Sequence, residues 1–283
     1  MTHFAGPANT MLKRPRRRAR LQRELSGVAA RHDVTIVIPV RNRSGAAIDN
    51  TLRALRQQTH PRELVHITMV DYGSEPVHTS WLTAAAARHT ATLIHVPSVT
   101  VWNKPHCLNI GISRATTRYV MALDADILLA SDYLEKAIVE LSRDPLQVVM
   151  NQIFDLSQAD SAFRSDFTDA DLSAARPKAV ARTPGLHHEG TILTATHVLK
   201  ELRGYDEHFR LWGAEDNDIV ERLVNYAMTP ATLSGKTFYL HQWHPQYDGA
   251  DPAVITRQFE ANWAYLRSVE KTLVRNEKGW GAL

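Results

Sequence analysis

The sequence predicts an α/β fold, in which a mainly parallel β-sheet is flanked by helices on both faces. Its N-terminal half alternates short apolar segments rich in β-branched residues with segments that repeat apolar residues at helical spacing. A chain of 283 residues, 44% of them hydrophobic, is long enough to bury such a sheet. Strands that alternate with helices are joined by right-handed crossovers, and they therefore run parallel.

The first half is expected to form four strands and three helices in strict alternation. Ile48, Leu52 and Leu55 recur at helical spacing in the first helix. The expected strands are "VTIVIPV" (34–40), "LVHITMVDYGS" (64–74), "ATLIHVP" (91–97) and "RYVMALDAD" (118–126). The expected helices cover 46–58, 81–89 and 104–115.

The second half is less regular. "DPLQVVMNQIFDLS" (144–157) indicates a further strand, and a helix is expected from Pro252, with Phe259, Trp263 and Leu266 at helical spacing. Residues 160–184 are polar and rich in alanine without clear periodicity. We expect them to form a long, mobile loop over a site.

The charge is unevenly placed. The formal net charge is only +3, yet Lys13 to Arg23 consists mostly of lysine and arginine and contains no acid. A solvated tail is the main interpretation, and a patch for an anionic membrane surface or an acidic partner is the alternative. Nucleic acid is disfavoured as a partner, because the rest of the chain is not basic.

The sequence also bears on the compartment. It contains no run of about 18 to 20 apolar residues, and its N-terminus lacks the apolar core of a secretory signal. The single cysteine, Cys107, excludes an internal disulfide. We therefore expect a cytoplasmic protein, peripheral at the inner membrane face if the basic segment binds lipid.

Polar residues gather where the predicted strands end, at 39–42, 71–74 and 124–126. Parallel sheets bind ligands at the carboxyl ends of their strands. Asp124 and Asp126 stand one residue apart, and in a strand their side chains would point to the same side. Two close carboxylates favour a cation between them, and hard oxygen ligands suit Mg²⁺ or Mn²⁺. The alternative is that they cap the next helix.

Six segments in order carry a resemblance to a known family: "IVIPVRNR", "VDYGS", "NKPHCLNIGI", "ALDAD", "GYDEHFRLWGAEDNDIVER" and "HQWH". Together they resemble family 2 glycosyltransferases, whose GT-A fold is a Rossmann-like, mainly parallel sheet with a smaller acceptor-side sheet. The resemblance covers 33–245, with a nucleotide-sugar half (33–126) and an acceptor half (127–245). It leaves out the basic tail (1–32) and a C-terminal helical extension (246–283).

The resemblance implies a donor site. It places Pro39, Val40 and Arg41 along the nucleotide pocket and gives Asp71 a hydrogen bond to the base. Tyr72 stands where the family usually has a second acid, so the base stays open, with UDP-sugars favoured. By itself, Asp71 would equally suit a turn before Gly73. The resemblance also places Asn103 and Lys104 near the donor, where Lys104 would neutralise diphosphate charge.

The metal site follows from the same resemblance. Asp126 matches the direct ligand of the D-x-D motif, and Asp124 matches the residue that faces the ribose or donor sugar. His241 would complete the site, and His244, next to Pro245, is the weaker candidate. The implied cofactor is a divalent metal, Mn²⁺ favoured over Mg²⁺. A lone histidine is otherwise more often a core or surface residue.

"WGAEDND" is similar to the W-G-G-E-D acceptor motif. The match makes Asp216 the catalytic base, Glu215 an acceptor-binding neighbour and Trp212 a platform for a sugar ring, while Ala214 replaces the second glycine. His188 is interpreted as a residue of the acceptor cleft. Without the family, these acids would be first-turn residues that stabilise a helix dipole.

These inferences predict a metal-dependent, inverting glycosyltransferase that moves a sugar from a nucleotide-diphosphate donor to a hydroxyl acceptor. A retaining mechanism is the alternative if the acid lies far from the acceptor. A nucleotidyltransferase is less consistent, because "PVRNRSGAAI" contains only Gly45 where a glycine-rich loop would stand. A catalytically silent nucleotide-sugar-binding protein is the third possibility.

Overall fold

The computed structural model describes residues 17–22, 32–97, 99–183, 191–245, 251–269, 272–277 and 279–283. Within them, a main sheet has the strand order β10-β6-β9-β4-β1-β2-β3. All neighbouring strands in it are parallel except β9, which is antiparallel to β4 and β6. The strands are β1 (Val34–Val40), β2 (Val65–Tyr72), β3 (Thr92–Val96), β4 (Tyr119–Leu123), β6 (Gln147–Met150), β9 (Thr191–Ala195) and β10 (Thr229–Thr232). The predicted α/β class is confirmed.

The central strand β1 is buried along its whole length because both of its faces are covered. Ile36 and Ile38 belong to the core on one side of the sheet, whereas Val37 belongs to the core on the other side. An uninterrupted apolar run is what a parallel strand between two helical layers requires.

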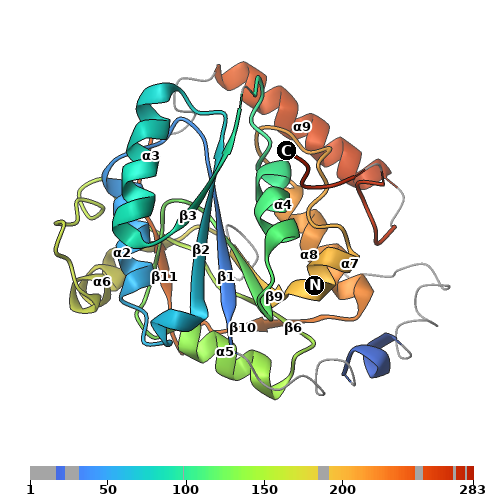
Figure 1. Cartoon of the computed structure of the whole chain (residues 1–283), viewed down its shortest axis with the longest axis horizontal. Helices are drawn as coiled ribbons and strands as arrows, with labels where there is room; N and C mark the ends of the chain where they lie inside the picture. The colour runs from blue at the N-terminus through green and yellow to red at the C-terminus, as the bar shows by residue number, and fades with distance from the viewer. Residues whose placement is uncertain are drawn as a thin grey trace.

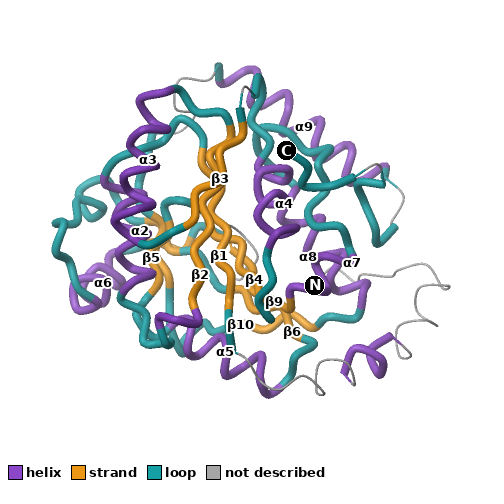
Figure 2. The backbone as a smooth tube through the Cα atoms, in the orientation of Figure 1, coloured by secondary structure: helices purple, strands orange, loops and turns teal. Residues whose placement is uncertain are grey.

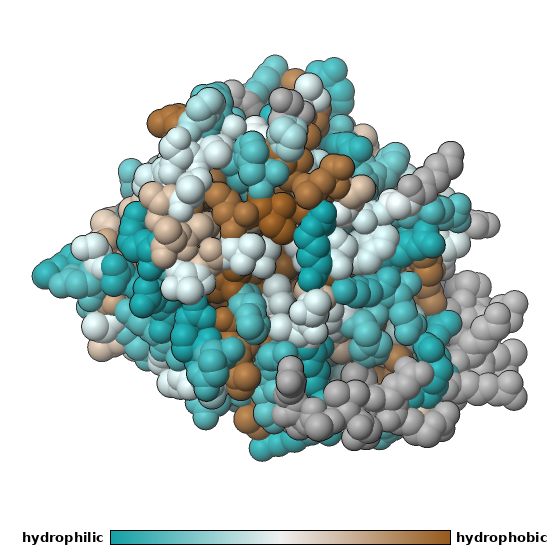
Figure 3. All heavy atoms as spheres, viewed as in Figure 1, coloured by the Kyte–Doolittle hydropathy of each residue, from teal (hydrophilic) through white to brown (hydrophobic). Residues whose placement is uncertain are grey.

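Helices form a layer on each face of the main sheet (Figures 1 and 2). One layer contains α2 (Ala46–Arg56), α3 (Pro76–His89) and α5 (Tyr133–Arg143), which share one apolar core. The other contains α4 (Lys104–Arg114), α7 (Thr196–Glu201) and α8 (Glu215–Tyr226), which share the second core. Figure 3 shows hydrophobic residues over the edge strand β3, whose Leu93 and Ile94 are only half-buried.

A smaller sheet has the order β5-β11-β7-β8. Its strands are β5 (Ile127–Leu129), β7 (Phe154–Asp155), β8 (Val180–Ala181) and β11 (Tyr239–His241). β5 follows directly on the "DAD" segment, and β11 pairs with both β5 and β7. The expected second sheet is therefore present, and it brings the distant strands β7, β8 and β11 to the segment that follows β4.

Two expectations about the chain differ from the structure. The fourth strand ends at Leu123, because residues 124–126 form a turn with Ile127 N donating to the Asp124 carbonyl at 3.3 Å. The expected loop at 160–184 is wrong over much of its length, since it contains α6 (Asp169–Ala175), η2 (Arg176–Lys178) and β8. A capping box between Thr168 and Asp171 starts α6.

Part of the basic N-terminal segment packs on the body of the protein. Residues 17–22 are helical, and Leu21 is fully buried in the core of α4, α7 and α8. Arg18 and Arg20 form ion pairs with Asp144 at 3.4 Å and Glu201 at 3.0 Å. These contacts differ from the expected solvated tail; residues 13–16 and 23 lie outside the described residues. No helix among the described residues is long and apolar enough to cross a membrane.

The helix α9 (Pro252–Ser268) forms where the sequence predicts a terminal helix. It lies beside the segment that precedes α8: the Asn262 amide donates to the carbonyls of Arg210 at 2.8 Å and Trp212 at 3.0 Å. The Tyr265 hydroxyl donates to Asp206 at 2.8 Å. These bonds make α9 a support for the acceptor motif.

The close approach of α4 to β1 makes a testable prediction at Gly111. A Cβ atom on Gly111 would lie 2.4 Å from Cγ1 of Val37. A glycine-to-alanine change in an unhindered helix stabilises by about 1 kcal/mol, but overpacking costs about 1 to 3 kcal/mol. We expect Gly111→Ala to lower the free energy of unfolding in chemical denaturation, and to lower it less in a Val37→Ala background. A stabilised single variant would contradict this packing.

Candidate active site

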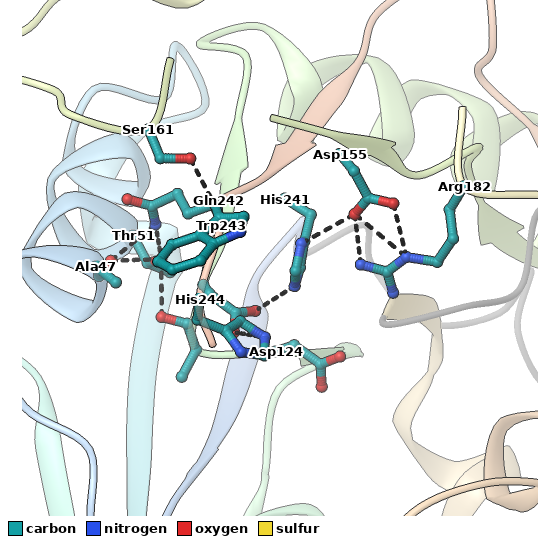
Figure 4. A network of polar contacts seen from close by, with 12 residues as sticks. Ala47, Thr51, Asp124, Asp155, Ser161, Arg182, His241, Gln242, Trp243 and His244 are labelled. Carbon is teal, nitrogen blue, oxygen red and sulfur yellow. Dashed lines mark hydrogen bonds and ion pairs between the residues drawn. The ribbon is translucent and has the colours of Figure 1, made fainter. Parts of the chain in front are cut away.

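The D-x-D turn sends its two carboxylates to different partners. Asp124 forms an ion pair with Lys104 at 3.0 Å, whereas Asp126 contacts His241 and His244. Figure 4 shows the Asp124 side chain extending away from the His244 ring. The strand rule that placed both side chains on one side does not apply, because β4 ends before Asp124. Two clusters therefore form in place of one shared site.

Asp126, His241 and His244 form the first cluster. Nε2 of His241 lies 3.5 Å from Oδ1 of Asp126, and Nε2 of His244 lies 3.5 Å from Oδ2. One ligand atom from each residue lies within 4.8 Å of the other two. Oδ1 of Asp126 is buried and accepts no hydrogen bond from the described residues. This is a fitting donor set for a divalent cation, and it includes His244, the weaker candidate.

His241 is oriented by a carboxylate behind it. Its Nδ1 lies 3.0 Å from Oδ1 of Asp155 (Figure 4). This contact leaves Nε2 facing Asp126. Arg182 in turn forms a two-nitrogen contact with Asp155, with a shortest distance of 2.6 Å. Burial raises the pKa of Asp155, but the hydrogen bonds from His241 and Arg182 outweigh it and hold that pKa far below its usual range. Sequence reasoning missed Asp155 and Arg182.

Gln242 ties the "HQWH" segment to the rest of the site. Its side chain is buried, its amide donates to the Ala47 carbonyl at 2.9 Å, and its Oε1 accepts from Asn50 at 3.0 Å. Its backbone N–H donates to the Asp126 carbonyl at 2.9 Å. The two histidines are thus fixed against both α2 and the D-x-D turn.

Arg43 is a third residue that sequence reasoning missed. It lies in the loop after β1, and its guanidinium forms a direct ion pair with Oδ2 of Asp126. Burial raises the pKa of Asp126, but interactions with His241, Arg43 and His244 bring it below its ordinary value. Asp126 is therefore an ionised carboxylate surrounded by groups that carry or accept positive charge.

Lys104 is the centre of the second cluster. Its Nζ lies 3.0 Å from Asp124, 3.4 Å from Asp216 and 3.7 Å from Glu215. Lys104 begins α4, while Glu215 and Asp216 begin α8, so the cluster forms where two helix N-termini meet. Burial and the charge of Asp216 raise the pKa of Glu215 to about 7, although Lys104 acts in the opposite direction.

The acceptor motif enters α8 through an unusual backbone. Leu211, Gly213 and Ala214 have φ angles of 56°, 102° and 72°. The left-handed region costs a non-glycine residue about 1 to 2 kcal/mol, so Ala214 carries more strain than the slight tightening expected. Trp212 is 56% exposed, and its ring stacks on Phe259 of α9 at 4.9 Å. Sequence reasoning found Trp212 but not this support.

Of the expected nucleotide-binding residues, Pro39, Val40, Arg41 and Asp71 lie at the ends of β1 and β2, where Asp71 and its neighbour Tyr72 have structural partners. Asp71 is fully buried: Oδ1 accepts from Ser74 N at 3.1 Å, and Oδ2 accepts from Thr79 at 2.7 Å and contacts His95 Nδ1 at 3.0 Å. This is the turn-forming arrangement that was its alternative. Tyr72 is also buried, with its hydroxyl 2.7 Å from Nδ1 of His106.

The remaining predicted residues are placed as follows. Pro39 and Val40 end β1, and Arg41 donates to the carbonyls of Val99 at 2.8 Å and Thr100 at 3.3 Å. Asn103 caps α4 by accepting from His106 N at 2.9 Å, and its amide donates to the Glu207 carbonyl at 3.0 Å. His188 lies outside the described residues.

The raised pKa of Glu215 predicts how stability varies with pH. Its ordinary value is 4.5 and its folded value about 7, so the folded state keeps a proton that the unfolded state releases in this window. The free energy of unfolding therefore falls as pH rises from 4.5 to 7. We expect Glu215→Gln to remove this loss, stabilising the protein at pH 8 by about 3 kcal/mol and not at pH 4.5. Thermal denaturation across pH tests this, and parallel curves for both proteins would contradict it.

The chain matches a known protein family, and its structure resembles solved structures. Residues 35–266 match the family model described as "Glycosyltransferase like family 2". The structure resembles S. aureus TarS 1–349 in complex with UDP, with TM-score 0.57, 16% identity, and 84% of this chain and 67% of that one covered. For S. aureus TarS 1–349 in complex with UDP-GlcNAc, the TM-score is 0.57 and the identity 15%, with 84% of this chain and 68% of that one covered. For S. aureus TarS, the TM-score is 0.57 and the identity 15%, with 84% of this chain and 41% of that one covered.

No curated protein matches the sequence. The likeness to TarS, at this identity, concerns the fold. The family match covers most of the chain and ends within α9, at residue 266. The protein therefore belongs to the family 2-like glycosyltransferases, and it is a glycosyltransferase with a GT-A fold.

Proposed function

We propose that the protein transfers a sugar from a nucleoside-diphosphate donor, with a UDP-sugar favoured, to a hydroxyl acceptor, with inversion at the anomeric carbon. The observation that carries the proposal is the pairing of two clusters on one turn: Asp126 with the two histidines, and Asp124 with Lys104, Glu215 and Asp216. The structurally similar TarS 1–349 has been crystallised with UDP and with UDP-GlcNAc, which supports the choice of donor.

Asp126, His241 and His244 would hold the metal. Oδ1 of Asp126, which is buried without a hydrogen bond from the part of the chain that the structure describes, and the oriented Nε2 of His241 fit a divalent cation. Two imidazole ligands favour Mn²⁺ over Mg²⁺, because Mg²⁺ prefers an all-oxygen shell. When bound, the metal supplies positive charge that stabilises the departing diphosphate.

Arg43 pairs with the same carboxylate. A cation at Asp126 would compete with its guanidinium for Oδ2. Guanidinium groups bind carboxylates and phosphates with the same fork geometry, so a released Arg43 could pair with donor phosphate. It thus joins the predicted donor-side residues Pro39, Val40 and Arg41.

Asp216 is the proposed base. The acceptor hydroxyl would give its proton to Oδ of Asp216 while its oxygen bonds to the anomeric carbon and the bond from that carbon to the diphosphate oxygen breaks. Attack opposite the leaving group inverts the configuration. Trp212, backed by Phe259, offers an apolar face for a sugar ring of the acceptor, with Glu215 and His188 as further proposed contacts.

The membrane contact proposed for Lys13 to Arg23 would rest on its other basic residues, because Arg17, Arg18 and Arg20 contact the body of the protein. A cytoplasmic location stays a prediction.

Metal-dependent nucleotide binding tests the donor site. We expect UDP to bind at least about tenfold more tightly with Mn²⁺ than with EDTA in titration calorimetry, since a cation held by Asp126, His241 and His244 would supply positive charge for the diphosphate. Asp126→Asn should abolish this gain, and the matched variant Asp124→Asn should retain most of it, because Asp124 contacts Lys104 instead of the histidines. An absence of metal-dependent binding for both UDP and GDP would refute the proposed donor site.

A donor screen tests the reaction itself. The protein is incubated with Mn²⁺ and a panel of nucleotide sugars, and mass spectrometry follows release of the nucleoside diphosphate. We expect slow hydrolysis of a UDP-sugar, accelerated by sugar acceptors. Nucleotide binding without release from any donor, under any acceptor, would favour the catalytically silent alternative.

A further inference from the structure

Lys104 has a different environment from the one expected of a diphosphate ligand. Its side chain is only 14% exposed, and its ammonium is surrounded by Asp124, Asp216 and Glu215 at 3.0, 3.4 and 3.7 Å. Asp124 and Asp216 lie within hydrogen-bond distance of the ammonium, and Glu215 lies slightly farther away. With Asp124 and Asp216 ionised, the cluster keeps a net negative charge even where Glu215 is protonated. A diphosphate that approached Lys104 would meet this negative charge.

The groups that could pair with a diphosphate, or hold a cation that does, lie in the other cluster. Arg43, His241 and His244 surround Asp126. The D-x-D turn therefore divides the site into a side with one guanidinium and two imidazoles at Asp126 and an acid-rich side at Asp216. The only ammonium on the acid-rich side, among the described residues, is Lys104.

The backbone of Lys104 is fixed to the acceptor segment. Asn103, directly before it, donates to the Glu207 carbonyl at 3.0 Å. Asn109, in the same helix, donates to the Tyr205 carbonyl at 2.8 Å. The Leu211 N–H donates to the Trp102 carbonyl at 3.0 Å. These hydrogen bonds fix the start of α4 in position relative to the segment that leads to Asp216.

We propose that Lys104 is a positioning residue for the base: it supplies the counter-charge that aligns the Asp216 carboxylate, and links it to Asp124 on the donor side, instead of binding the diphosphate. This inference rests on the proposed function for its kinetic consequences. The cluster geometry supports it independently, because a base among other acids works only if its ionised form has a counter-charge.

The titration of the cluster agrees with this role. Burial lowers the pKa of Lys104, but Asp124, Asp216 and Glu215 raise it well above its ordinary value, so the ammonium persists at neutral pH. Burial and the charge of Asp216 raise the pKa of Glu215 to about 7, so Glu215 is partly protonated at neutral pH. Burial also raises the pKa of Asp124, although Lys104 acts in the opposite direction. The groups that interact with Asp216 include Lys104, Glu215 and Asp124, and the phenols Tyr205 and Tyr239.

The kinetic test uses Lys104→Met and the conservative Lys104→Arg. We expect Lys104→Met to bind UDP with Mn²⁺ within about twofold of the wild-type Kd, by titration calorimetry, and to lose at least about 100-fold in kcat/KM at pH 7. The acidic limb of its pH profile should move up by about one pH unit or more, because the ionised base loses its counter-charge. Lys104→Arg should restore the position of that limb. A tenfold weaker UDP affinity with an unmoved pH profile would overturn the inference and make Lys104 a diphosphate ligand.

A second measurement does not depend on turnover. Thermal unfolding at pH 8 is compared for wild type, Lys104→Met, Asp216→Asn and the double variant. We expect Lys104→Met to lower Tm less in the Asp216→Asn background, since the partner charge is already absent. Additive Tm shifts would overturn the inference even if no donor were found. Coupled shifts in a protein that transfers no sugar would instead reject the proposed function alone.

Discussion

Two carboxylates follow β4 at the edge where the main sheet ends, and each needs a counter-charge of its own. A buried ionised carboxylate without a partner is strongly destabilising, so the residues around Asp124 and Asp126 are constrained by charge before they are constrained by shape. The turn at 124–126 points the two carboxylates toward different partners. Asp126 contacts Arg43 and the two histidines, and Asp124 forms an ion pair with Lys104. The chemical division of the site follows from this separation.

Elements outside the main sheet hold both sides of the site. The small sheet places Asp155 of β7 behind His241 of β11, and Gln242 fastens the same segment to α2. On the acceptor side, α9 supplies Asn262 and Phe259 to the backbone and ring of Trp212. The left-handed Ala214 is retained at the entry to α8, where the chain must turn sharply to present Glu215 and Asp216. The acceptor motif therefore combines a strained backbone at Ala214 with contacts from α9, which is distant in sequence.

Much of the first half could be predicted from sequence, because its order depends on local signals. β1 reads as a buried parallel strand, and α2 carries its apolar residues on one face. The D-x-D geometry was mispredicted because strand alternation was applied past the end of the strand. Four further site residues were not predicted for another reason, because each lies far in sequence from the residue that it contacts: Arg43 contacts Asp126, Asp155 contacts His241, Arg182 contacts Asp155, and Phe259 contacts Trp212. Asp71 had two local interpretations, and only its contacts with Thr79 and His95 show that it is buried in a turn.

The central claim is that Asp216 removes the acceptor proton during direct displacement of the diphosphate. The most direct measurement is a single-turnover comparison of wild type and Asp216→Asn, with the donor found by screening, Mn²⁺ and a saturating acceptor, followed by NMR of the product's anomeric proton. The account predicts an inverted linkage in the wild-type product and a 100- to 10,000-fold slower transfer, by order of magnitude, in Asp216→Asn with unchanged UDP affinity. A retained configuration, or undiminished transfer by Asp216→Asn, would contradict it.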